Sequence, residues 1–112
     1  MSDYSIMRQL GLSKIAVTCY QDLFESGGSD AASMAERIGH SRTGLYRYLT
    51  DLEAKGFVKS VKTEPYVTYY YAELLNKALV NYAKYQRLLV RQLLEEQEAE
   101  MARRSGKSGV AS

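Results

Sequence analysis

A group of side chains suited to nucleic-acid recognition lies between positions 41 and 47. Arg can bond guanine through two hydrogen bonds, Ser and Thr can reach bases or phosphates, and Tyr can donate to phosphate. No Asp or Glu interrupts residues 41–50, so a phosphate backbone would meet no repulsion there. We therefore predict contact with double-stranded DNA through Ser41, Arg42, Thr43, Tyr46 and Arg47.

These side chains must be displayed on one face of a helix. Ser41 is a suitable N-cap, and Gly56 occupies the position after a helix that glycine favours. Between them, apolar residues recur at helical spacing and predict a buried face, formed by Leu45, Leu49 and Leu52. If that face points inward, the candidate DNA-binding residues point outward.

The preceding segment predicts the partner helix of a helix-turn-helix. Asp30 can cap a short helix that runs to Ile38, and Gly39 then breaks it. Two helices that cross closely need a small residue in the first helix and a sharp turn between them, which Ala35 and Gly39 supply.

After Gly56 the pattern changes to that of strands. Residues 57–62 and 66–72 are rich in Val, Tyr and Thr, and the Thr-Glu-Pro segment that separates them predicts an antiparallel hairpin. Lys59 and Lys62 on this hairpin are further candidate DNA contacts, although strand lysines equally often serve solubility. The expected fold is mainly α with a small β-hairpin, namely a winged helix-turn-helix followed by a long C-terminal helix.

The long helix is predicted over residues 73–104, which contain no Gly or Pro, and it would span about 45 Å. Its apolar residues step by alternating fours and threes, the spacing of a coiled-coil seam. We expect dimerisation through Leu75, Leu79, Tyr82, Leu89 and Leu93. The alternative is that this helix folds back on its own domain.

The predicted organisation has four parts. Residues 1–12 form an N-terminal extension, which Ile6, Met7 and Leu10 could make helical. Residues 13–72 form the winged helix-turn-helix, with its first helix capped by Ser13. Residues 73–104 form the dimerisation helix, and residues 105–112 are expected to be a disordered tail.

The composition of the chain disfavours several classes of function. The chain of 112 residues has one domain's length, and its net charge of +2 does not by itself indicate a nucleic-acid partner. A single cysteine excludes an internal disulfide. With one histidine, no Gly-rich phosphate loop and no clustered carboxylates, no catalytic constellation is apparent, so we expect neither an enzyme nor a cofactor. Cys19 is expected to pack as a small apolar residue, with a redox sensor as the alternative.

No apolar run is long enough for a membrane span, and the first residues do not resemble a signal peptide. We therefore expect a cytoplasmic protein, associated with the nucleoid, that has no membrane partner.

Two segments, LGLSKIAVTCYQDLFESG from Leu10 and SMAERIGHSRTGLYRYLTDLEAKGFV from Ser33, resemble the DNA-binding domain of TrmB-type winged-helix regulators, within the MarR-like group. The resemblance implies that Arg42, Thr43, Tyr46 and Arg47 lie on the recognition helix and the two hairpin lysines on the wing. Many TrmB-type proteins carry a sugar-sensing domain after a coiled-coil linker. This sequence ends after the helix, so we expect no small-molecule effector.

The resulting hypothesis is a sequence-specific regulator that binds double-stranded DNA as a homodimer. We expect a repressor, although activation is equally compatible with the sequence. The alternative is a winged-helix module that docks a protein partner, motivated by residues 69–71, which are three consecutive tyrosines. Strand alternation would turn at least one of these tyrosines outward.

Overall fold

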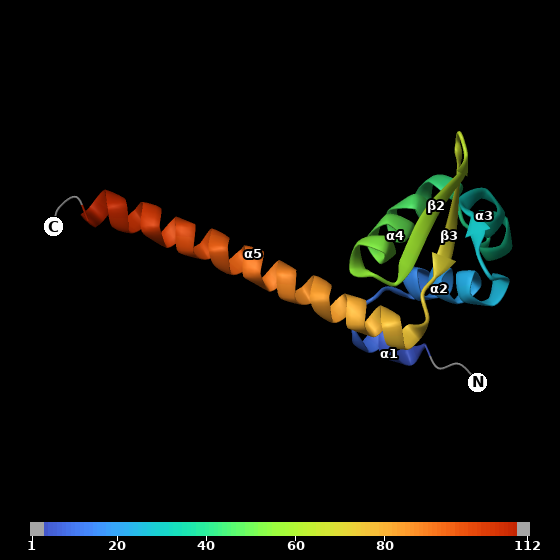
Figure 1. The fold of residues 1–112 in the computed structure, drawn as a ribbon, viewed down its shortest axis with the longest axis horizontal. Coiled ribbons are helices and arrows are strands. Elements are labelled where there is room, and N and C mark those ends of the chain that lie inside the picture. Colours follow the sequence, from blue (N-terminus) through green and yellow to red (C-terminus); the bar gives the residue numbers. More distant parts are fainter. Residues whose placement is uncertain (1–3, 110–112) are drawn as a thin grey trace.

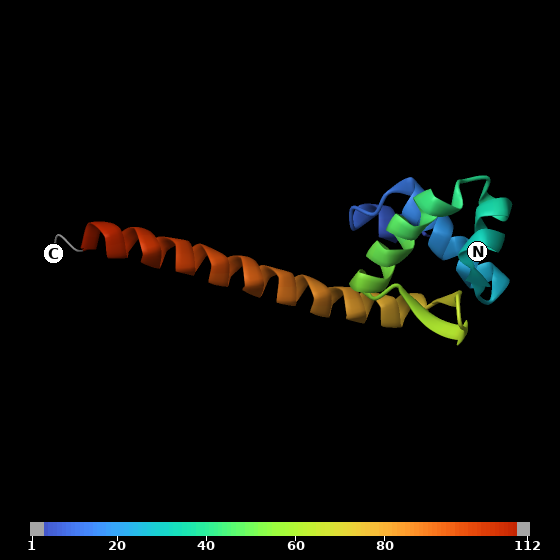
Figure 2. The same cartoon turned by 90° about the horizontal axis from the view of Figure 1, so that it is seen from above.

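The computed structural model describes residues 4–109, and the side chains of residues 4–105. A small domain sits at one end of a long helix, which projects away from it (Figure 1). In the second view the hairpin lies along one side of that domain, with the shorter helices on the other (Figure 2). The molecule measures 64 × 35 × 22 Å, and the projecting helix accounts for most of its length.

The elements follow the predicted order with two additions, a first short helix and a first short strand. In chain order they are α1 (Ser5–Gln9), α2 (Lys14–Ser26), β1 (Ser29–Asp30), α3 (Ala31–Ile38), α4 (Arg42–Lys55), β2 (Val58–Glu64), β3 (Val67–Ala72) and α5 (Leu75–Gly109).

The predicted helix caps are confirmed. The Ser13 Oγ accepts a hydrogen bond from the Ala16 N–H at 3.2 Å, and the Asp30 carboxylate accepts one from the Ser33 N–H at 3.1 Å. The Ser41 Oγ accepts one from the Gly44 N–H at 3.0 Å. These contacts satisfy backbone donors that the first turn of a helix leaves unpaired, so they mark where α2, α3 and α4 begin.

The sheet has one strand more than the two-stranded ribbon that the sequence predicted. β2 and β3 form the expected antiparallel hairpin, and β1 pairs with the other edge of β3 to give the order β1-β3-β2. A strand of two residues shows no alternation, so the sequence pattern could not reveal it. Gly28 allows the chain before β1 to lie this close to β3, because any side chain there would clash: a Cβ would lie 2.6 Å from the Tyr71 ring.

In the core, the predicted inner face of α4 packs against α2, the start of β2 and the start of α5. Tyr20 and Phe57 are fully buried at its centre, with ring centres 6.1 Å apart. The Tyr20 hydroxyl donates to the Glu73 carbonyl oxygen, and the Glu73 N–H donates to the Phe57 carbonyl oxygen at 2.9 Å. These bonds hold the connection between β3 and α5 against the domain.

The N-terminal segment and α5 both depart from the predicted division of the chain. α1 forms where a helix was thought possible, and its Met7 is fully buried in the core, so this segment is part of the domain. α5 begins two residues later than predicted and continues to Gly109. Residues 105–109, expected in a disordered tail, are therefore helical, and residues 110–112 lie outside the described residues.

The long helix is divided between two environments. Up to Tyr85 one face packs on the domain, where Ala78 and Tyr82 are buried and the Asn81 Nδ2 donates to the Gly56 carbonyl oxygen at 3.0 Å. Every side chain from residue 86 to residue 99 is exposed. Leu75 and Tyr82, expected at a dimer seam, thus pack within their own chain. The folding-back alternative holds for this first part of α5.

Candidate DNA interface

The exposed face of α4 lies between two shallow hollows, and the two predicted arginines stand at opposite edges of it. Arg42, at the edge nearer the hairpin, has its guanidinium carbon 5.9 Å from the centre of the Tyr46 ring. Arg47 has its guanidinium carbon 5.4 Å from the centre of the Tyr48 ring. Both arginines are exposed, while Leu45 and Leu49 on the reverse face are fully buried and hold the helix rigidly.

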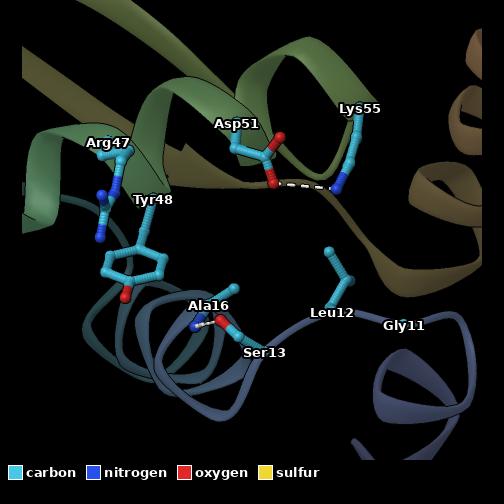
Figure 3. Close-up of a pocket in the computed structure, with 8 residues that line it drawn as sticks. All are labelled: Gly11, Leu12, Ser13, Ala16, Arg47, Tyr48, Asp51 and Lys55. Carbon is cyan, nitrogen blue, oxygen red and sulfur yellow. Dashed lines mark hydrogen bonds and ion pairs between the residues drawn. The ribbon is translucent and has the colours of Figure 1, made fainter.

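The hollow beside Arg47 has a volume of about 370 Å³ and separates α4 from the beginning of α2. Figure 3 shows the lining residues of α4 on one side of it, namely Arg47, Tyr48, Asp51 and Lys55, and Gly11, Leu12, Ser13 and Ala16 on the other. The N-terminus of α2, which carries the positive end of the helix dipole, opens here. The Asp51 carboxylate is paired with the Lys55 Nζ at 2.9 Å, and these two charges cancel. Arg47 therefore gives the lining of the hollow a net positive charge.

The hollow beside Arg42 is smaller, about 110 Å³, and lies between α3, α4 and the tip of the hairpin. It carries charges of both signs, because Asp30 lines it as well as Arg42. Hydrogen bonds from Ser33 lower the pKa of the Asp30 carboxyl and keep it ionised at neutral pH. The hollow therefore does not select for an anion.

Ser41 and Thr43 are both exposed at the start of α4. The Ser41 Oγ already serves as the helix cap, which leaves its hydroxyl hydrogen as the group able to donate elsewhere. Thr50 is a residue that the sequence analysis did not name. It is exposed and lies on the same helical face as Thr43 and Arg47, at spacings of seven and three residues.

The two hairpin lysines are exposed but lie on opposite faces of β2. The Ser60 Oγ donates to the Glu53 Oε2 at 2.7 Å, so the face that carries Ser60 is turned toward α4. Lys62 shares that face by strand alternation, and Lys59, which pairs with Tyr71, lies on the other. The structure therefore brings Lys62 to the side of α4 and does not bring Lys59 there. The odd spacing of the two lysines already indicated this separation.

Tyr66 at the hairpin turn is another functional candidate that the sequence analysis missed. Its side chain is fully exposed, beside the chain's single proline, and it lines the hollow that Arg42 also borders. The sequence did carry a signal for this candidate: Tyr66 is an aromatic residue in a tight turn, where no neighbour can cover its ring.

Cys19 and His40 each pack against other parts of the domain. Cys19 is fully buried, and burial, with a smaller contribution from Asp22, raises the pKa of its thiol to about 11. A thiol held in its protonated form is a poor redox sensor. The His40 ring stands edge-on to Tyr48 with centres 6.1 Å apart, and Gly44 leaves room for it, because a Cβ there would lie 2.5 Å from the ring.

The three consecutive tyrosines alternate as expected for a strand. Tyr70 is buried toward α4, while Tyr69 and Tyr71 are half-buried on the other face with ring centres 6.0 Å apart. Among residues 4–109 no helix is long and apolar enough to cross a membrane. Within the same range no group of His, Cys, Asp and Glu side chains could hold a metal ion.

Comparison of the sequence with known protein families identifies a family of transcriptional regulators. The family model described as "Sugar-specific transcriptional regulator TrmB" matches residues 7–85. A search of curated proteins found no match to the sequence.

Several solved structures share the fold at low sequence identity. A possible transcriptional regulator from Methanosarcina mazei Go1 has a TM-score of 0.60 at 14% identity, covering 84% of this chain and 83% of its own. The YusO protein from Bacillus subtilis has a TM-score of 0.57 at 16% identity, covering 95% of this chain and 80% of its own. NadR, solved in complex with 4-hydroxyphenylacetate, has a TM-score of 0.56 at 21% identity, covering 88% and 79%. These likenesses confirm the winged-helix fold.

Proposed function

Because this chain belongs to the TrmB family of transcriptional regulators, and is therefore a regulator and not an enzyme, we propose that it acts by binding double-stranded DNA as a homodimer. In this proposal the homodimer represses transcription by occupying a promoter. The family match over residues 7–85 confirms the resemblance, since it includes both segments on which that resemblance rests.

The observation that carries the proposal is the exposed face of α4. This face is free of acidic residues over its first turns and has an exposed arginine at each edge. An α-helix fits the major groove of B-DNA, where Arg can read guanine, so Arg42, Thr43 and Arg47 are the residues we expect to contact bases or their flanking phosphates. Buried leucines behind them keep the helix in place when DNA binds.

Flanking elements provide suitable groups for the DNA backbone. The N-terminus of α2 and Arg47 border one side of α4, and a helix N-terminus favours phosphate. On the other side, Lys62 and the exposed Tyr66 extend the surface along the hairpin. Contacts of this kind position a protein on DNA without reading sequence.

The homodimer is supported by the projecting part of α5. Leu89 is 40% exposed and Leu93 54% exposed; Val90 and Leu94 are exposed beside them, and Met101 is exposed two turns further along. Such a stripe on a helix that no described part of the chain covers is typical of a coiled-coil seam. Two copies would present two α4 helices, which could read half-sites about one helical turn apart.

A fluorescence anisotropy titration tests the proposal, using duplex DNA from the region flanking the protein's own gene at two salt concentrations. We expect binding that weakens steeply and linearly with the logarithm of salt concentration, because Lys and Arg displace counterions from phosphate. Arg42→Ala and Arg47→Ala should each weaken specific binding by roughly 1–3 kcal/mol.

Arg103→Ala is the matched control, since this exposed arginine lies far along α5 and should leave affinity unchanged. Circular dichroism would check that each variant is folded. Unchanged affinity in both α4 variants, or weak binding that is independent of salt, would contradict the proposal and favour docking of a protein partner.

A further inference from the structure

The turn of the hairpin carries an aromatic ring that no other described part of the chain covers. Tyr66 is fully exposed, whereas Tyr46, the next most exposed tyrosine among the described residues, is 40% exposed. An aromatic ring offers a large apolar area, and such rings contribute strongly where a partner buries them. Tyr66 is therefore the side chain of the hairpin best suited to an apolar contact.

The turn holds this ring in a defined position. The Tyr66 N–H donates to the Glu64 carbonyl oxygen at 2.9 Å, across Pro65, whose ring fixes the backbone φ angle. The pairing of β2 with β3 also shifts register between Lys62 and Glu64, just before the turn. Binding that buries the Tyr66 ring therefore has to order little of the backbone.

The charges around the turn do not suit a row of phosphates. Residues 63–76 contain no Lys or Arg, and Glu64 is the charged residue nearest to Tyr66 along the chain. Lys62, on the face of β2 toward α4, is the closest cation before the turn. Phosphates beside the turn would meet repulsion from Glu64. A contact between this turn and DNA is therefore favoured within a groove, between the two phosphate rows.

The turn lies where it can reach the groove next to the one that α4 would occupy. Tyr66 lines the same hollow as Arg42 and Tyr46, at the start of α4. The hairpin extends past α3 and α4, and the turn is its outermost part (Figure 1). With α4 in the major groove, an element that extends past α4 on this side meets the bordering phosphate row and then the minor groove. Lys62 can hold that row, and Tyr66 at the turn can reach the groove beyond it.

We propose that Tyr66 enters the minor groove beside the α4 site and inserts its ring between adjacent base pairs. This inference rests on the proposed function and extends it, because an inserted side chain partly unstacks the DNA at a cost that depends on sequence. Pyrimidine–purine steps such as TA unstack most readily. Tyr66 is thus a specificity-determining residue that selects flexible steps outside the bases that α4 reads.

Permanganate footprinting tests the insertion, because permanganate oxidises thymines that are unstacked. The probe is duplex DNA from the region flanking the protein's own gene, prepared with TA steps on each side of the protected segment. We expect reactive thymines at these flanking steps with the wild-type protein and with Tyr66→Phe, which keeps the ring, and none with Tyr66→Ala. Circular dichroism would check that each variant is folded.

Val61→Ala is the matched control for the hairpin. Val61 is exposed and pairs with Tyr69, on the face of the hairpin turned away from α4. This substitution removes apolar area from the same hairpin without touching the turn. It should leave the permanganate pattern of the wild-type protein unchanged.

An exchange of the flanking base steps gives a second readout. Replacing the flanking TA steps by GG steps should weaken binding of the wild-type protein and of Tyr66→Phe by about tenfold. The same replacement should leave the affinity of Tyr66→Ala unchanged, because that variant has no ring to insert. Anisotropy titrations at one salt concentration measure both effects.

The outcomes separate this inference from the proposed function. Salt-dependent DNA binding without reactive thymines, or with equal reactivity in the wild-type protein and Tyr66→Ala, would overturn the insertion and leave the proposed function in place. Equal loss of reactivity in Tyr66→Phe and Tyr66→Ala would assign the effect to the hydroxyl and would also overturn the insertion. A wild-type protein that does not bind duplex DNA would overturn both.

Discussion

Gly56 ends α4, is separated from β2 by one residue and contacts Asn81 of α5. Its φ is +91°, in the left-handed region, and a Cβ there would lie 2.3 Å from the Asn81 Cβ. The Asn81 side chain also donates to the Gly56 carbonyl oxygen. A single position thus ends α4 and sets how closely the long helix can approach the domain.

We predict that Gly56→Ala lowers the free energy of unfolding by about 2–4 kcal/mol, from backbone strain together with the clash against Asn81. Gly39→Ala is the matched control, because Gly39 has a φ of +80° but no atom within 4 Å of its Cβ position. The control should cost only about 1–2 kcal/mol. Urea unfolding of both variants measures the difference, and equal losses would show that contact with Asn81 is unimportant.

At the scale of elements, the hairpin presents two chemically different faces. The face of β2 toward α4 carries Lys62, and the opposite face carries Lys59 with the half-buried Tyr69 and Tyr71 of β3. A hairpin that flanks DNA bound to α4 can offer only one of these faces to the same backbone.

We therefore predict unequal effects of the two lysines on DNA binding. Lys62→Ala should weaken binding similarly across DNA sequences and reduce the salt slope by about one, as expected for one lost phosphate contact. Lys59→Ala, a substitution of another exposed lysine three residues earlier, should leave both quantities unchanged. Anisotropy titrations over a range of salt concentrations would check this, and a larger effect at Lys59 would reverse the assignment of the faces.

At the scale of the whole molecule, α5 serves two purposes. Its first turns complete the core of the domain, and its remaining turns project beyond it (Figure 1). Stability of the domain and self-association should therefore be separable by substitutions in the projecting part.

We predict that Leu89→Asp with Leu93→Asp raises the dimer dissociation constant by more than about tenfold, since the substitutions place charge in an apolar seam. Leu88→Asp is the control, because Leu88 is similarly exposed but faces away from the stripe. Sedimentation velocity measures the association. Equal effects of the control and the double variant would indicate a general effect on the helix and not loss of a seam.

The stability of the whole domain should also fall at alkaline pH. Burial raises the pKa of the Cys19 thiol from 9.0 to about 11 and, with smaller contributions from Tyr4 and Glu73, that of the Tyr20 hydroxyl from 10.0 to about 12. The folded chain keeps protons that the unfolded chain releases at lower pH. The contribution to stability is therefore complete below about pH 9 and is lost as the pH rises through these folded values.

Urea unfolding at intervals between pH 8 and pH 11 would measure this loss. Tyr20→Phe should reduce the pH dependence above pH 10, because it removes one of the two groups. A free energy of unfolding that does not change over this range would show that neither group keeps its raised pKa in solution.

Sequence signals that act within a few residues predicted most of this fold. The N-caps at Ser13, Asp30 and Ser41 and the stop at Gly56 are such signals, since each depends on backbone groups within one helical turn. The inward leucines of α4 followed from helical period, which also determined which side chains face outward. The composition and spacing of α4 therefore identified the candidate interface before any tertiary contact was known.

Only the tertiary structure decided where distant segments meet. β1 has no pattern of its own and exists because Gly28 lets the chain pass beside Tyr71. Likewise, a continuous apolar stripe cannot tell which of its residues the same chain will cover. The domain covers Tyr82 and leaves Leu93 exposed, because the core ends after three turns of α5 while the helix continues.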